Sequence, residues 1–136
     1  MKTVHLLRVD RSAANFADLV TAAQAGGMRI GWLDLENLAA APAALEAAAQ
    51  TGVLRAVSVA AGRTVAVKPH RGAPVLKDLL REYFRGCRLV LVLGAVDAAV
   101  LTPDGQSWTV RAADGKVFNW TTHQLVARLR KARPFG

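Results

Sequence analysis

A chain of 136 residues with 52% hydrophobic and 21% charged residues has the size and composition of one globular domain, which excludes disordered and fibrous proteins. Its 18 basic residues outnumber its 10 acidic ones and give a net charge of +8, with fourteen of the basic residues after Gly52. An excess of this kind favours a polyanionic partner, nucleic acid before a membrane surface. We expect a single domain over residues 1–136.

The sequence has no feature of export or membrane insertion. Its start lacks the basic, apolar and small-residue order of a signal peptide, and its longest apolar runs are far below the roughly 18 residues that span a bilayer. We therefore expect a cytoplasmic protein without membrane contact. The single cysteine, Cys87, excludes an internal disulfide and a cysteine zinc cluster, and its place beside an apolar strand predicts a buried thiol.

The first third of the chain predicts a strand, a helix and a second strand. Thr3–Val9 and Met28–Leu35 are apolar with β-branched residues, which is typical of strands. Between them apolar residues recur at helical spacing as far as Ala25, and Asp10 or Ser12 can cap this helix. Together they predict a βαβ unit.

The next segment predicts a helix followed by a hairpin. Ala39–Gln50 is nearly all alanine and favours a helix by propensity, with Pro42 near its start. Val53–Val59 and Thr64–Val67 are strand-like and close in sequence, and Gly62 can supply the turn between them.

The segment from Arg63 to Gly94 predicts the clearest strand–helix–strand unit of the chain. Its strands are Thr64–Val67 and Arg88–Leu93, and its helix runs between Pro74 and Gly86. The apolar face of this helix should consist of Val75, Leu76, Leu79, Leu80, Tyr83 and Phe84.

The last third predicts an antiparallel meander and a helix. Its strands are Ala98–Leu101, Ser107–Arg111 and Val117–Trp120, separated by turns at Pro103–Gly105 and at Asp114 and Gly115. Thr121 or Thr122 can cap the final helix.

These elements define the fold class. A parallel unit comes first and hairpins dominate later, so we expect an α/β fold of the α+β sandwich type. It should contain a mixed sheet with an N-terminal βαβ unit followed by hairpins, and helices packed on the sheet.

From about Pro42 to Lys131 the expected order is a helix, two strands, a helix, three strands and a helix. This order is similar to that of the roadblock family of dimeric dynein-associated and GTPase-regulating modules, with an extra strand at Val117–Trp120 and an added βαβ unit in front. The resemblance implies a homodimer that binds a partner protein and catalyses nothing.

Basic residues form the main candidate site. Lys77, Arg81 and Arg85 are spaced four apart and predict a stripe along one helix, to which the preceding turn and the final helix add charge. Backbone N–H groups at the start of that helix also favour anions. The candidate nucleic-acid-binding residues are Lys68, Arg71, Lys77, Arg81, Arg85, Arg128 and Lys131.

Simpler interpretations of the same charges remain open. Asp78 and Glu82 stand three residues before Arg81 and Arg85, so surface ion pairs can occupy part of the stripe. Cations at the end of the final helix also complement its dipole, and the whole excess can serve solubility.

A second kind of site is conceivable at strand ends. Asp10, Asp34 and Glu36 would share a divalent metal if the first two strands were parallel neighbours, as in α/β hydrolases. The alternative, which we favour, has Asp10 or Ser12 capping the first helix and Asp34 in a turn. Trp108, Phe118 and Trp120 could stack bases, but on strands they more often belong to the core.

The sequence contains no catalytic, metal-binding or nucleotide-loop motif, and we expect no cofactor. It therefore favours a non-enzymatic module that binds nucleic acid through phosphates. The alternatives are a homodimeric protein-interaction scaffold and, third, a metal-dependent hydrolase.

Overall fold

The structure is a computed structural model, which describes residues 4–36, 42–70, 72–73 and 75–135. Its contacts divide the chain into two compact units, residues 1–36 with 82–136 and residues 37–81. The expectation of a single domain stays a prediction.

The elements follow the predicted order. They are β1 (His5–Val9), η1 (Ala13–Phe16), α1 (Ala17–Ala25), β2 (Ile30–Asp34), α2 (Ala43–Ala49), β3 (Ala56–Ala60), β4 (Arg63–Val67), α3 (Leu76–Tyr83), β5 (Leu89–Leu93), β6 (Ala99–Asp104), β7 (Ser107–Arg111), β8 (Val117–Thr121) and α4 (Thr122–Leu129). Among the described residues, no helix is long and apolar enough to cross a membrane.

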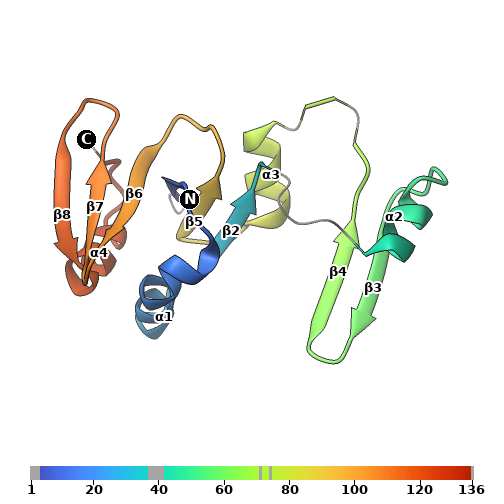
Figure 1. Ribbon diagram of the computed structural model, residues 1–136, viewed down its shortest axis with the longest axis horizontal. Coiled ribbons are helices and arrows are strands. Elements are labelled where there is room, and N and C mark those ends of the chain that lie inside the picture. The colour runs from blue at the N-terminus through green and yellow to red at the C-terminus, as the bar shows by residue number, and fades with distance from the viewer. Residues whose placement is uncertain (1–3, 37–41, 71, 74, 136) are drawn as a thin grey trace. The chain divides into compact units, whose positions relative to one another are not determined.

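The first unit is built on a six-stranded mixed sheet in the order β2-β5-β1-β6-β7-β8 (Figure 1). β2, β5, β1 and β6 run parallel, and β6, β7 and β8 form the predicted antiparallel meander. This mixed sheet and its helices confirm the predicted fold class.

The first two strands are parallel but are not neighbours, because β5 lies between β1 and β2. The condition for a metal site shared by the ends of these two strands is therefore not met. All five residues of β5, Leu89–Leu93, are buried. At the centre of a parallel sheet both faces of a strand are covered and excluded from water. A strand that is apolar on both faces is therefore most stable there, and β5 takes that place.

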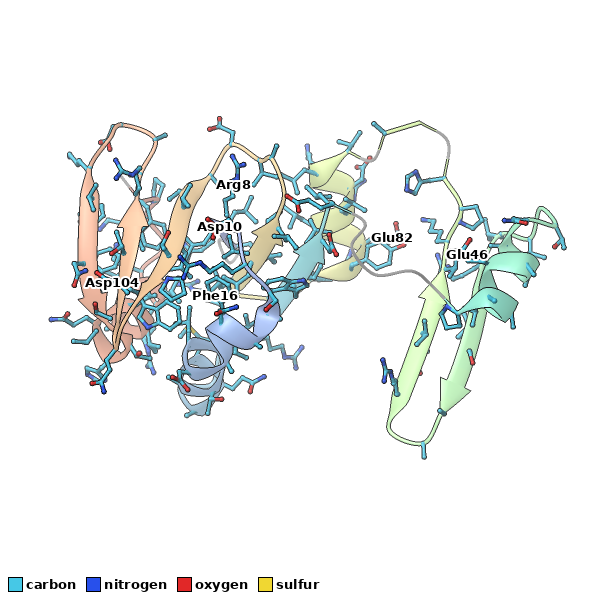
Figure 2. The ribbon with its side chains drawn as sticks, in the orientation of Figure 1. Arg8, Asp10, Phe16, Glu46, Glu82 and Asp104 are labelled. Carbon is cyan, nitrogen blue, oxygen red and sulfur yellow. The ribbon has the colours of Figure 1, made fainter. Side chains whose placement is uncertain are left out.

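One face of the sheet carries the main core. Alternate residues of β1 and β5 point to this face and pack on Phe16 and Leu19 (Figure 2 labels Phe16) and on Leu125 and Leu129 of α4. These four side chains are fully buried, and burying each contributes about 1.5–3 kcal/mol. Helices α1 and α4 also contact each other.

The opposite face is covered in part by the residue that follows α3. Val90 and Val92 are fully buried there, beside Gly31 of β2. A Cβ atom at Gly31 would lie 2.3 Å from Cδ1 of Phe84. The ring of Phe84 therefore packs directly on the backbone of β2, and only glycine leaves it room.

The second unit contains α2, the β3–β4 hairpin and the part of α3 up to Arg81. Its helix and hairpin match the prediction for residues 39–67. The loop is the two residues between Ala60 and Arg63, with Gly62 at a φ of 76°. Leu45 and Ala49 of α2 are buried, and so is Ala56 of β3. These residues form the small core of the unit.

The predicted strand–helix–strand unit from Arg63 to Gly94 exists as elements but not as one sheet. Among the described residues β4 pairs only with β3, whereas β5 belongs to the six-stranded sheet. The physical reason is that β1 and β2 occupy both edges of β5, and a tight turn joins β4 to β3. The start of the helix at Pro74 lies outside the described residues.

The ends of elements confirm one predicted cap and correct another. Thr121 forms a capping box with Gln124, with Thr121 Oγ1 accepting from the Gln124 N–H at 3.1 Å. Ser12 precedes η1, but its hydroxyl accepts from the Asn15 side chain at 3.1 Å and caps no backbone N–H. The first turn is a 3₁₀ turn whose Asn15 N–H already bonds the Ser12 carbonyl.

The turn predicted at Pro103 begins later, because Pro103 and Asp104 belong to β6 and the loop is Gly105 and Gln106. Pro103 stands opposite Trp108, beyond the two β6 residues that pair with β1. A proline without an N–H is tolerated where no neighbouring strand needs one.

Replacing Gly31 with alanine should destabilise the protein. A Gly→Ala change inside a strand ordinarily stabilises by about 0.5–1 kcal/mol. Here the clash with the Phe84 ring should reverse the sign and lower the unfolding free energy by about 1–3 kcal/mol. Urea unfolding followed by tryptophan fluorescence measures this. In a Phe84→Leu background the same change should cost less, and equal costs in both backgrounds would refute the contact.

Candidate functional site

The helix α3 carries part of the predicted basic stripe. Lys77 and Arg81 are exposed on it, and Arg81 Nη2 lies 2.8 Å from Asp78 Oδ1, the ion pair that the sequence predicts. Both side chains are more than half exposed, so the pair stabilises the helix by only a few tenths of a kcal/mol. A phosphate can compete with Asp78 at this position.

Arg85 does not extend the helical stripe. α3 ends at Tyr83, and Arg85 is exposed in the turn that follows. This turn is closed by the Cys87 N–H, which donates to the Phe84 carbonyl at 3.1 Å, and Gly86 adopts a φ of 84°. Lys68 follows β4 and is half-buried, and Arg71 lies outside the described residues.

Arg128 is committed to the C-terminal segment. Its Nη2 donates to the Pro134 carbonyl at 2.7 Å, and its guanidinium lies 4.5 Å from the centre of the Phe135 ring. Burial, followed by the charge of Arg133, lowers the pKa of Arg128. The side chain would have to leave Phe135 before it could contact a phosphate freely.

The end of α4 is held by two residues that the sequence did not single out for this role. Arg88 donates from Nε to the Leu129 carbonyl at 2.7 Å and from Nη2 to the Arg130 carbonyl. His5 Nε2 donates to the Lys131 carbonyl at 2.6 Å. These bonds satisfy carbonyl groups that a helix end leaves open. The side chain of Lys131 itself is exposed.

A basic pocket lies next to this helix end, within the first unit. Its volume is about 610 Å³, and three arginines from three parts of the chain line it: Arg29 before β2, Arg88 before β5 and Arg130 after α4. None of the described residues lining it is acidic. The lining residues are Gly27, Met28, Arg29, Gly86, Cys87, Arg88 and Arg130.

Cys87 lines this pocket and is only partly buried, so the prediction of a buried cysteine is wrong. The reason is local. Cys87 belongs to the turn before β5 and not to the strand, and the burial of the strand begins at Leu89.

The carboxylates predicted as an alternative metal site do not gather. Asp10 is exposed at the end of β1 (Figure 2), with one carboxyl oxygen 3.7 Å from Arg11 Nε. Asp34 accepts from the Glu36 N–H at 2.8 Å in the turn after β2. Because β5 separates β1 from β2, their backbones stand about 10 Å apart. Among the described residues, no group of three or more histidine, cysteine or acidic side chains could hold a metal ion.

The aromatic residues of the meander belong to the packing of the sheet. Trp108 is 5% exposed, and its Nε1 donates to Thr122 Oγ1 at 2.8 Å. Phe118 and Trp120 stack on each other with ring centres 4.8 Å apart, and both pack against the core. This agrees with the interpretation that places them in the core.

No protein-family model matches the chain, and no curated protein matches its sequence at a significant level.

The environment of His5 should make stability depend on pH. Burial lowers the pKa of His5 below its ordinary value of 6.5; the bond to the Lys131 carbonyl opposes this, and the charges of Arg88 and Arg128 add to it. The folded state therefore favours the neutral ring. As the pH falls below 6.5 the unfolded chain binds a proton first, so stability should fall with it and be fully present above 6.5.

Urea unfolding at a series of pH values from 5 to 8 tests this. The variant His5→Gln keeps an N–H donor but does not titrate, so its unfolding free energy should fall less steeply below pH 6.5. His70 and His123 are present in both proteins, so the difference between the two curves reports on His5. Parallel curves for the two proteins would rule out this role of His5.

Proposed function

We propose that the protein is a non-enzymatic module that binds nucleic acid through its phosphates. The observation that carries this proposal is a set of exposed cations without an acidic partner among the described residues. Lys77, Arg85 and Lys131 are such cations. A cation held by a carboxylate must exchange one anion for another, whereas these three can bind a phosphate without that exchange.

The distribution of charge supports the same proposal. Residues 37–81 hold six basic and two acidic residues, and the remainder holds twelve and eight, so each unit carries a net charge of +4. A positive field on both units attracts a polyanion to either of them. Phosphate contacts of this kind position a nucleic acid but read no sequence.

The proposed contacts do not all weigh equally. Lys68, Arg71, Lys77, Arg81 and Arg85 make up the first group, with Lys131 as an addition. Arg81 contributes less than Lys77 because Asp78 competes for it, and Arg128 contributes only if it leaves Phe135. Free solubilising charge is the competing explanation, and it predicts no saturable binding.

Salt dependence tests the proposal. If about five phosphates are neutralised, the logarithm of duplex affinity should fall with the logarithm of salt concentration at a slope of about −4 to −5. Fluorescence anisotropy of a labelled duplex measures the slope. The double variant Lys77→Gln/Arg85→Gln should reduce its magnitude by about 2.

The double variant Arg111→Gln/Lys116→Gln removes the same charge from β7 and the turn before β8, and it should leave the slope nearly unchanged. If the duplex does not bind at low salt, or if its affinity does not depend on salt concentration, the proposal is wrong. An equal loss in both double variants would show that net charge, and not α3 and its turn, decides binding.

A protein-interaction module is the second candidate, and the hairpin of the second unit favours it. Within the described residues β3 and β4 pair only with each other, and Val57 and Val59 of β3 are 54% and 76% exposed. Open strand edges beside exposed apolar residues are suited to pairing with another chain. Sedimentation at micromolar concentration should show a dimer in this case, and a strict monomer would argue against it.

A further inference from the structure

We propose that the pocket lined by Arg29, Arg88 and Arg130 is a binding site for a phosphate monoester, either a small phosphorylated molecule or the terminal phosphate of a nucleic-acid strand. The strand-end form rests on the proposed function. The binding of a phosphate monoester does not.

The three arginines reach the pocket from different directions. Arg29 Nη1 lies 3.6 Å from where a Cβ of Gly86 would stand, which places it over the turn after α3. Arg130 extends to the other side, where its Nη2 lies 3.4 Å from the Gly26 carbonyl. Arg88 comes from the start of β5, between the two. Guanidinium groups arranged around one cavity can donate to several oxygens of one anion.

Arg88 is held in place before any ligand arrives. Its Nε and Nη2 donate to the Leu129 and Arg130 carbonyls, and its Nη1 has no acceptor among the described residues. A donor that is already fixed loses little conformational freedom when it binds, so it favours tight binding. The side chains of Arg29 and Arg130 are more loosely held, since that of Arg130 makes one long hydrogen bond and that of Arg29 makes none to another described residue.

The charge balance of the pocket favours an anion with more than one charge. The pocket contains three guanidinium groups, and the C-terminus of α4 offsets them by about half an elementary charge. A phosphate monoester carries about −1.5 to −2 charges and three terminal oxygens near neutral pH. A backbone phosphodiester or a carboxylate carries one charge, so each would leave most of the repulsion between the arginines in place.

The size of the pocket agrees with this ligand class. A volume of about 610 Å³ is within the range of about 300–1,000 Å³ of ordinary small-molecule sites. The phosphate group alone would fill only part of it. The remaining space can hold the sugar or another group that carries the phosphate.

Cys87 gives a local readout of occupancy, because it lines the pocket and is the only cysteine of the chain. Inorganic phosphate should slow its alkylation by N-ethylmaleimide, a neutral reagent, in a saturable manner. Sodium chloride at the same ionic strength should not slow this alkylation. The absence of saturable protection by phosphate would overturn the proposal.

Variants separate the pocket from the general charge of the protein. Arg29→Gln and Arg130→Gln should each weaken phosphate binding about tenfold or more, because each removes a hydrogen bond to a charged group. Arg111→Gln removes the same charge from β7, outside the pocket, and should change the affinity less than twofold. Arg88 is left intact because it also holds the end of α4. Equal weakening by all three changes would overturn the proposal.

Three oligonucleotides of one sequence distinguish the sources of the phosphate: one with a 5′-phosphate, one with a 3′-phosphate and one with neither. Tighter binding of a phosphorylated strand, lost in Arg29→Gln, supports the strand-end form. Equal binding of all three, with protection of Cys87 by inorganic phosphate, assigns the pocket to a small phosphate monoester.

The same experiments distinguish the phosphate pocket from the proposed nucleic-acid binding. Salt-dependent binding of the unphosphorylated strand without any protection of Cys87 would overturn the pocket and leave the proposed function standing. Protection of Cys87 by inorganic phosphate without binding of any strand would support the pocket and overturn the proposed function.

Discussion

The burial of β5 on both faces is the constraint on which the rest of the first unit depends. Because β5 pairs with β1 on one side and β2 on the other, the residues that precede all three strands meet at one edge of the sheet. The backbone records this directly: Arg88 donates its N–H to the Arg29 carbonyl at 2.8 Å, and its own carbonyl accepts from His5 N–H at 2.8 Å. The position of the arginine pocket therefore follows from the order of the strands.

Local patterns predicted the order of the elements, because each signal lies within a few residues. Gly62 closes the hairpin and Thr121 caps α4, and each of these roles can be recognised from the few residues around it. The pairing of strands was not predictable in the same way. The apolar run Leu89–Leu93 indicated a buried strand, but nothing in it specifies which two strands become its neighbours. The inserted position of β5 is a property of the whole sheet, and it separates Asp10 from Asp34.

The same limit applies to the candidate site. The pair of Arg81 with Asp78 was predictable because a spacing of three places both on one helix face. Arg88 contacts Leu129 across 41 residues and His5 contacts Lys131 across 126, so no local spacing could reveal them. In the sequence Arg29 counts only toward total charge, and Arg130 only as one of the cations at the end of the final helix. The apolar pattern continues to Phe84 and so extends the predicted helix to Arg85, whereas α3 ends at Tyr83 and Arg85 belongs to the turn with Gly86.

Arg88 connects the stability of the fold with the chemistry of the pocket. Its bonds to the Leu129 and Arg130 carbonyls hold the end of α4, and the partial negative charge of that helix end in turn makes the position favourable for a cation. The helix end offsets about half a charge, whereas Arg29 and Arg130 add two whole charges nearby. The pocket therefore holds an excess of positive charge that no described residue lining it neutralises. An anion that binds there is stabilised by that excess, and by linkage it stabilises the fold that gathers the three arginines.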